Sequence, residues 1–220
     1  MADRLIDSPA KPRLRGVSHE WAFFLSLPLG LWLVVSAPNG RAALAAGVYA
    51  LSVALLFGSS ALYHRITWAS AAARRWMRRL DHSAIFLLIA GTFTPFAVLT
   101  LDGTLATVIL VAVWAGAAAG IVMTLVWIDA PKWLIAIVYV ALGWVAVAAM
   151  PSMLDRLGVT AVALVAAGGA LYTAGAVIYA RRRPDPAPTV FGYHEIFHVL
   201  VIAAAALQYA VVAFYVVPRA

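Results

Sequence analysis

The chain has 220 residues, of which 65% are hydrophobic and only 11% are charged, and its mean hydropathy is +0.93. A soluble globular domain carries about 25% charged residues, so this composition excludes an ordinary soluble enzyme and indicates an integral membrane protein. The formal net charge of +7 belongs to no soluble basic domain, so we assign it to membrane topology and expect no nucleic-acid partner. Because the chain lacks cysteine, any metal must be held by histidine, carboxylate and water.

Seven apolar stretches are each long enough to cross roughly 30 Å of hydrocarbon as a helix. They occupy residues 20–37, 42–63, 82–101, 104–128, 133–153, 157–180 and 195–217. We therefore predict an all-α fold, a seven-transmembrane helix bundle that forms one domain over residues 19–218 after an N-terminal tail at 1–18. Val35-Ser36-Ala37 resembles a signal-peptidase site, but Pro38 argues against cleavage there, so the first stretch is kept as a span.

The distribution of positive charge predicts the orientation of the bundle. With the N-terminus inside, 13 of the 16 Lys and Arg residues fall on the cytoplasmic side, where such residues are retained. The inner loop at 65–80 carries four arginines among aromatic and apolar residues, namely Arg74, Arg75, Arg78 and Arg79, which is typical of a short helix lying in the headgroup layer. We expect a multi-pass protein of the plasma (inner) membrane, with membrane lipids and anionic inner-leaflet headgroups as partners.

Small residues lighten the fourth span, where Gly116 and Gly120 form a GxxxG pattern. This pattern allows two helices to approach closely, either at a dimer seam or inside one bundle. With seven helices in one chain, we favour close packing inside the bundle.

The five histidines all fall at predicted cytoplasmic helix ends: His19, His64, His82, His194 and His198. His194 and His198 lie one turn apart on one helical face, so they can share a metal ion. If the ends of the second and seventh spans converge, His64 completes a set of three neutral imidazoles. Three imidazoles and a water form a tetrahedral site with an open position, as in catalytic zinc centres.

Two polar residues accompany these histidines. Asp81 opens the third span on the same side, and Ser60 lies one turn deeper than His64 on the same face. Asp81 is a candidate to hold a zinc-bound water and take its proton, and Ser60 to hydrogen-bond the water, Asp81 or a substrate carbonyl. Structural roles also remain open: Asp81 as a helix N-cap, Ser60 bonded to a carbonyl of its own helix, and His64 and His82 as interfacial residues.

Together these residues resemble a known family. Ser60-x-x-x-His64, Asp81 seventeen residues beyond His64, and His194-x-x-x-His198 resemble the signature of the hemolysin III proteins and the related progestin and adipoQ receptors (PAQR). Asp81-His82, Ala90-Gly-Thr-Phe-Thr-Pro95 and Phe191-Gly-Tyr-His-Glu-Ile-Phe-His198 are similar to the bacterial hemolysin III branch.

The resemblance implies a zinc (Zn2+) site in which His64, His194 and His198 are ligands, Asp81 is bound through water and Ser60 lies nearby. It also implies a seven-helix fold with the N-terminus inside. The family has a Glu and an Asn upstream of a first-span His, and His19 matches only that His. Lys11 and Arg15 stand near the places of the acid and the amide, which leaves the role of that upstream pair open.

Three functions follow as hypotheses. A zinc-dependent hydrolase of lipid amide or ester bonds, acting in membrane lipid homeostasis, is favoured by an open three-histidine site beside a carboxylate. An intramembrane metalloprotease is the second, since His194-Glu195-x-x-His198 matches the HExxH pattern with Glu195 as general base; it leaves Ser60, His64 and Asp81 unexplained. The third is non-enzymatic, a sensor or receptor of membrane state or a cytolytic hemolysin. No span has a polar stripe suited to a wide channel, so a pore is the weakest reading.

Overall fold

The computed structural model describes residues 11–220. Residues 1–10 of the N-terminal tail expected at 1–18 therefore lie outside the described residues. Within the described range the chain is built of helices and contains no strand. The helices are α1 (Val17–Val35), α2 (Gly40–Arg65), α3 (Ala71–Leu99), α4 (Gly103–Val126), α5 (Lys132–Gly143), α6 (Ala146–Leu157), α7 (Val159–Arg181) and α8 (Tyr193–Val211). A π-helical turn at Val212–Val216 and a 3-10 turn at Val217–Arg219 extend α8.

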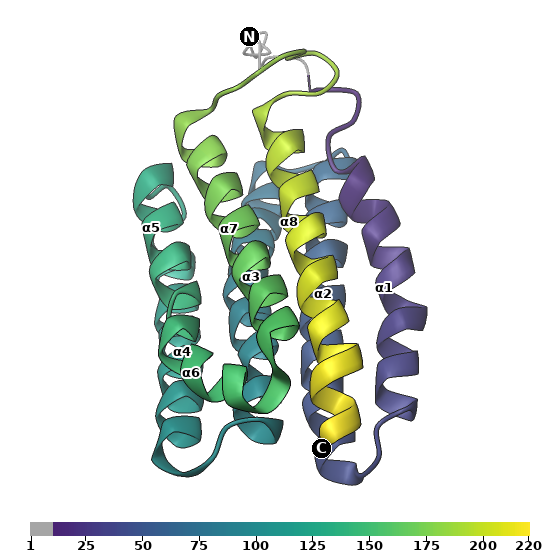
Figure 1. Ribbon diagram of the computed structural model, residues 1–220. Coiled ribbons are helices and arrows are strands. Elements are labelled where there is room, and N and C mark those ends of the chain that lie inside the picture. Colours follow the sequence, from purple (N-terminus) through teal and green to yellow (C-terminus); the bar gives the residue numbers. More distant parts are fainter. Residues whose placement is uncertain (1–10) are drawn as a thin grey trace, which may run out of the picture.

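Seven helical segments are long and apolar enough to cross a membrane, with α5 and α6 together forming the segment Lys132–Leu157. They run side by side along one axis (Figure 1). Each packs mainly on its neighbour in sequence, and α8 also contacts α1, so the first and last helices lie side by side. The predicted all-α, seven-span membrane bundle is therefore confirmed. The fifth span is interrupted at Trp144 and Val145, directly after Gly143, because glycine disfavours the helical interior.

The inner loop at 65–80 differs from the expectation. No separate headgroup helix forms there, because α3 begins at Ala71 and continues to Leu99 without a break. Ser70 caps this helix by accepting a hydrogen bond from the Ala73 N–H at 3.1 Å. The segment from 71 to 80 contains only residues that tolerate a helix and no Gly or Pro, so nothing stops it from joining the apolar span. The four arginines accordingly lie in the first three turns of α3.

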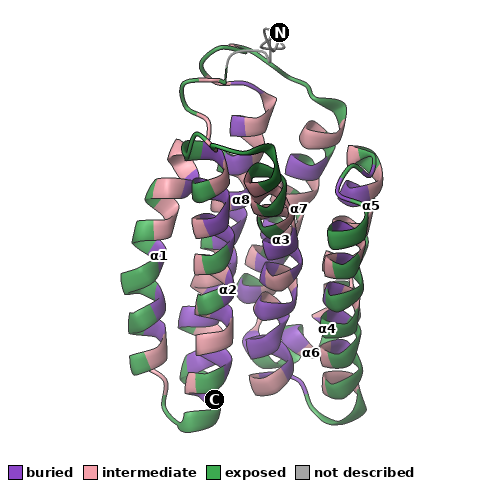
Figure 2. Ribbon diagram, turned by 180° about the vertical axis from the view of Figure 1, so that it is seen from behind, coloured by how far each residue is buried: buried purple, intermediate pink, exposed green. Residues whose placement is uncertain are grey.

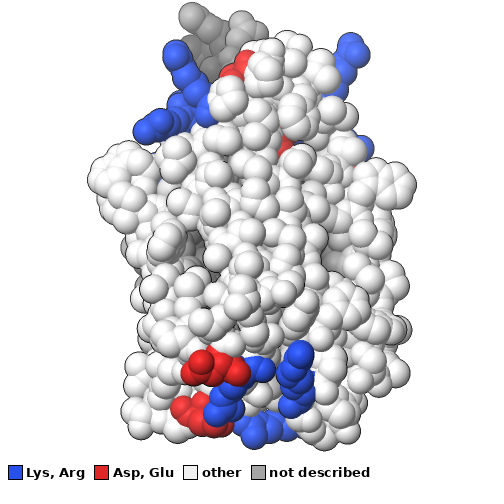
Figure 3. All heavy atoms as spheres, viewed as in Figure 1, with Lys and Arg blue, Asp and Glu red and all other residues white. Residues whose placement is uncertain are grey.

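The surface of the bundle has charged ends and an uncharged apolar belt, as expected of a protein that spans a membrane. Lys, Arg, Asp and Glu gather at the two ends, and a broad belt between them is uncharged (Figure 3). Large apolar side chains such as Leu25, Leu51 and Phe214 are exposed on that belt. Buried residues lie on the inward faces, above all on α2, α3 and α8 (Figure 2). Since lipid replaces water around the belt, the exposed apolar side chains are not a docking surface.

The glycines of the fourth span pack inside the bundle. A Cβ added at Gly120 would lie 2.2 Å from the Phe86 ring of α3, and one added at Gly116 would lie 2.5 Å from Leu142 of α5. Such distances are shorter than any ordinary contact, so a larger side chain at Gly120 would strike a buried ring, and one at Gly116 would require the end of the Leu142 side chain to move. Phe86 itself is fully buried in the central apolar core. The GxxxG pattern is thus used within the chain, as its sequence context favoured.

Candidate metal centre

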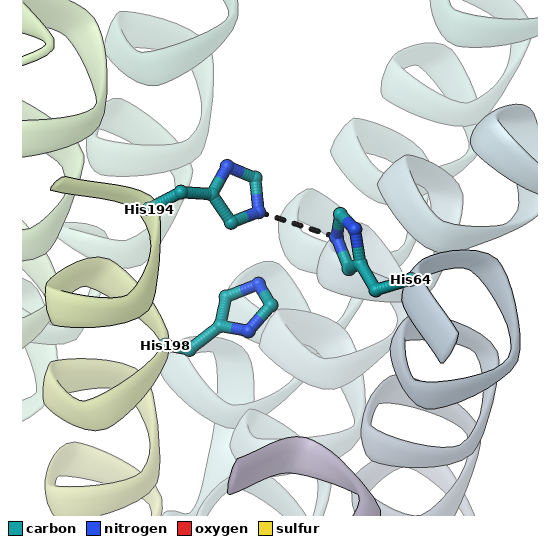
Figure 4. Close-up of side chains that lie close together, drawn as sticks. All are labelled: His64, His194 and His198. Atoms are coloured by element: carbon teal, nitrogen blue, oxygen red, sulfur yellow. Dashed lines mark hydrogen bonds between the residues drawn. The ribbon is translucent and has the colours of Figure 1, made fainter. Parts of the chain in front are cut away.

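Three imidazoles converge at the end of the bundle where α8 begins. His64 comes from the last turn of α2, and His194 and His198 come from the first two turns of α8 (Figure 4). One nitrogen of each ring lies within 4.8 Å of the others. His64 Nε2 and His194 Nε2 are 3.2 Å apart, and two nitrogens bound to one tetrahedral zinc lie roughly 3.3 Å apart. The two rings already stand at the spacing that a shared ion requires.

The local sequence explains this geometry. The α8 helix begins at Tyr193, and Glu195 accepts a hydrogen bond from the Gly192 N–H at 2.8 Å, which fixes the first turn. With the helix begun there, His194 and His198 project from one face one turn apart. His198 is buried, and its Nδ1 has no hydrogen-bond partner among residues 11–220. An unpaired buried nitrogen is costly. Three neutral nitrogen donors without a thiolate suit zinc, so the residues present fit this metal.

Asp81 and Ser60 reach the same place from two different helices. Asp81 Oδ2 lies 3.8 Å from His64 Nε2, beside the ring and beyond hydrogen-bond distance. Asp81 is not the N-cap of its helix, because α3 begins ten residues earlier with Ser70 as its cap. Ser60 Oγ lies 2.8 Å from His19 Nδ1 and is almost fully buried. Both residues line the cavity onto which His194 and His198 face.

His19 and His82 lie near the three-histidine cluster without belonging to it. The His19 ring is stacked on His198, with centroids 3.8 Å apart and planes inclined by 7°. Through this stack and its bond with Ser60, His19 holds two residues of the site in place. His82 Nδ1 lies 2.7 Å from the Arg78 carbonyl oxygen one turn earlier. The structure thus places His19 as a support and His82 as a residue bonded to its own helix.

Both carboxylate oxygens of Glu195 have partners, so this residue is not free to act as a general base. Its side chain is buried, one oxygen accepts from the Gly192 N–H, and the other is paired with Arg15 in a very short contact. Arg15 was the residue whose role the sequence left open. It replaces an expected amide and here provides the partner of a buried carboxylate. The motif spacing could not reveal this pair, because the two residues are 180 positions apart.

A segment preceding α1 closes this end of the site. Backbone hydrogen bonds join Arg13 N–H to the Thr189 carbonyl at 3.0 Å and Leu14 N–H to the Val190 carbonyl at 3.1 Å. Gly16 then turns the chain with φ of +81°, and a Cβ on it would lie 2.6 Å from the Cβ of His64. Only glycine permits both that conformation and that approach. The histidines are therefore covered by chain on the side of the loops.

On the other side the cluster faces an internal cavity of about 270 Å³. Apolar side chains of α3, α5, α6, α7 and α8 form most of its wall, among them Ile85, Phe93, Met153 and Val201. Figure 3 shows the surface hollowed between α5 and α7. The cavity can hold a hydrocarbon chain next to the histidines. Sequence reasoning did not find these residues, since each alone is an ordinary residue of an apolar span.

Comparison with known proteins shows the family to which this chain belongs. The family model described as "Haemolysin-III related" matches residues 8–209. The chain belongs to the hemolysin III family. It is 32% identical over 204 residues to a protein named "Hemolysin-3 homolog" of Bacillus subtilis (strain 168), covering 91% of this chain and 92% of that protein. It is also 32% identical over 207 residues to "Hemolysin-3" of Bacillus cereus, covering 93% and 91%. As a hemolysin III protein with seven apolar helices it is a multi-pass membrane protein, and its bacterial relatives are consistent with the plasma membrane.

Proposed function

We propose that this hemolysin III protein is a zinc-dependent hydrolase of lipid amide or ester bonds, with its N-terminus in the cytoplasm. The observation that carries the proposal is that Asp81, Ser60 and two of the three clustered histidines, His194 and His198, line one apolar cavity, while His64 completes the cluster beside them. A purely structural metal would need no adjoining carboxylate and no cavity. The shared motif spacing extends the proposal to a relationship with the PAQR proteins.

The chain supplies the parts that such a reaction needs. His64, His194 and His198 would hold zinc, which when bound lowers the pKa of a water and polarises a carbonyl group. The Asp81 carboxylate accepts the proton of the attacking water and returns it to the leaving amine or alcohol. Ser60, fixed by His19 at 2.8 Å, donates its hydroxyl hydrogen to the substrate carbonyl oxygen. The cavity binds the acyl chain and keeps bulk water from the reaction.

The alternatives receive less support from the contacts of this chain. A metalloprotease of the HExxH type needs Glu195 as a free base, and Glu195 is instead committed to Arg15 and to Gly192. A sensor or receptor of membrane state would use the same cavity without turnover. It leaves no role for the carboxylate of Asp81 at 3.8 Å from His64. A cytolytic role is suggested only by the names of the relatives.

The experiment compares the lipids of a deletion strain complemented with wild type, His198→Ala, Asp81→Asn or Asp129→Asn. Asp129 is an exposed acid paired with Arg78 at the same end of the bundle, so it is a matched control for the loss of a carboxylate. We expect wild type and Asp129→Asn to lower one lipid class and release its fatty acid, and the other two variants to do neither. Purified protein in liposomes of that lipid must then release the fatty acid directly. Identical lipid profiles for wild type and His198→Ala would refute hydrolysis and leave a sensor.

A further inference from the structure

The first turns of α3 carry a positive surface that the proposed hydrolysis does not use. With 29 residues, α3 is roughly 43 Å long, whereas the hydrocarbon layer is about 30 Å thick. Its first turns are largely exposed, as the view from behind shows (Figure 2). They belong to the same end of the bundle as the histidines. This part of α3 therefore stands at the level of the lipid headgroups.

Of the four arginines on this surface, only Arg78 has an acidic partner within residues 11–220, and Arg74, Arg75 and Arg79 have none. Arg75 and Arg79 are one turn apart on one face of the helix, where like charges repel each other. Neither is in a salt bridge within residues 11–220. Asp129, the acid that α3 does engage at this end, is paired with Arg78 at 2.8 Å. Arg75 and Arg79 thus form a site of positive charge that the described chain does not neutralise.

The surroundings of these arginines form a small hollow with one apolar wall. Arg79 is fixed, since its Nε donates to the Leu125 carbonyl oxygen at 3.0 Å and its guanidinium carbon lies 5.1 Å from the centroid of the Trp76 ring. The hollow has a volume of about 360 Å³ and is lined by Ala72, Arg75, Trp76, Arg79 and Leu125. Trp76 and Leu125 are both exposed beside it. We call this hollow the α3–α4 basic pocket.

We propose that the α3–α4 basic pocket binds the phosphodiester headgroup of an anionic phospholipid. Guanidinium groups bind phosphate oxygens through paired N–H donors, and Arg75 with the terminal nitrogens of Arg79 supplies them. The indole of Trp76 and the side chain of Leu125 then contact the glycerol and the first carbons of the acyl chains. This apolar wall favours a lipid over a soluble phosphate. The site lies outside the metal centre and does not depend on hydrolysis.

The test measures lipid binding to the full-length protein in a neutral detergent by native mass spectrometry. Phosphatidylglycerol should bind more tightly than phosphatidylcholine. Each arginine near an anionic headgroup contributes a factor of about five. Arg75→Gln, which breaks no side-chain hydrogen bond or salt bridge within the described chain, should therefore weaken phosphatidylglycerol binding about fivefold, and Arg75→Gln with Arg79→Gln about 25-fold. Arg181→Gln with Arg183→Gln is the control, since it removes the same charge from the exposed end of α7 and the loop that follows it, at the same end of the bundle.

The outcomes separate a specific site from general attraction. The proposal requires that the control pair keeps wild-type affinity and that Arg75→Gln and the control pair melt at the wild-type temperature in phosphatidylcholine. Equal loss in the control pair would show a diffuse effect of charge and overturn the proposal, as would unchanged binding in the Arg75 and Arg79 variant. Inorganic phosphate at millimolar concentration is a separate arm. If it displaces phosphatidylglycerol completely, the pocket recognises free phosphate and the lipid proposal is wrong.

Discussion

The pair of Arg15 and Glu195 allows a quantitative test of how the N-terminal segment is held over the metal centre. Only 3% of the Glu195 side chain is exposed, whereas 21% of the Arg15 side chain is. Removing one partner of a buried ion pair costs about 3–5 kcal/mol, because the other charge is left without compensation. Arg15→Ala leaves the buried Glu195 carboxylate with the Gly192 N–H alone. We therefore expect Arg15→Ala to lower the free energy of unfolding by about 3–5 kcal/mol.

Glu195→Ala should cost less, at roughly 1–2 kcal/mol. Its Arg15 partner is less buried and can extend toward water, so most of the expected cost is the lost bond at the start of α8. Arg65→Ala is the control, because its partner Glu20 is 2.8 Å away in a pair whose side chains are 44% and 39% exposed. Such exposed pairs contribute about 0.2–1 kcal/mol. The order of destabilisation should be Arg15→Ala, then Glu195→Ala, then Arg65→Ala.

The assay is equilibrium unfolding in mixed detergent micelles, followed by circular dichroism, with the double variant Arg15→Ala and Glu195→Ala completing a mutant cycle. A coupling free energy of at least ~1 kcal/mol is expected, since the two groups touch. A buried ion pair would be ruled out if Arg15→Ala were no more destabilising than Arg65→Ala, or if the effects of Arg15→Ala and Glu195→Ala added in the double variant. Either result would mean that Glu195 is not a buried charge in the folded protein.

Three further predictions follow from other parts of the chain. Asp81→Asn should keep most of the zinc of wild type and lose hydrolysis, as metal and product analyses can show, and metal loss equal to that of His198→Ala would make Asp81 a direct ligand. Gly120→Ala should destabilise the protein by about 1–3 kcal/mol through overpacking, since its Cβ would strike Phe86, whereas Gly169→Ala meets nothing within 4 Å and should be neutral or up to about 1 kcal/mol stabilising in the same unfolding assay, since alanine favours a helix interior over glycine. Because the chain has no cysteine, a single cysteine at Ser70 or Thr189 should react with an impermeant maleimide only from the cytoplasm, and one at Asn39 or Asp102 only from outside; reversed labelling would move the metal centre to the outer leaflet.

Most helices of the fold could be predicted from the sequence, because a membrane-spanning segment must be a long run of apolar residues. Each continuous apolar stretch of about 20 residues was expected to form a helix, since a helix satisfies all its backbone hydrogen bonds within one segment, and residues 11–220 contain seven such segments. The prediction of a separate surface helix within residues 65–80 was wrong, because composition does not distinguish a surface helix from the extension of a membrane span. The arginines of α3 suit both places, and only the absence of a helix breaker between Ser70 and Gly91 indicated the continuous form.

The site was readable where spacing along one helix determines geometry, as for His194 and His198. Contacts between distant segments were not. Nothing local in the sequence indicates that His19 stacks on His198, or that Arg15 meets Glu195 across 180 positions. The sequence did not indicate the cavity either, because its wall is made of common apolar residues from six helices. Such features depend on how the helices pack against one another. Residue types and their spacing along one helix do not determine this packing.

The most direct test of the account is the zinc content of the purified protein. The chain should be prepared without a polyhistidine tag and without chelators, and its metals measured by inductively coupled plasma mass spectrometry. We expect about one zinc per chain in wild type and in His82→Ala, whose ring lies outside the cluster and contacts the Arg78 carbonyl. His64→Ala, His194→Ala and His198→Ala should each fall to background and melt at a lower temperature, since a bound ion stabilises the folded state. Wild-type protein without zinc, or equal zinc in His82→Ala and His198→Ala, would contradict the account.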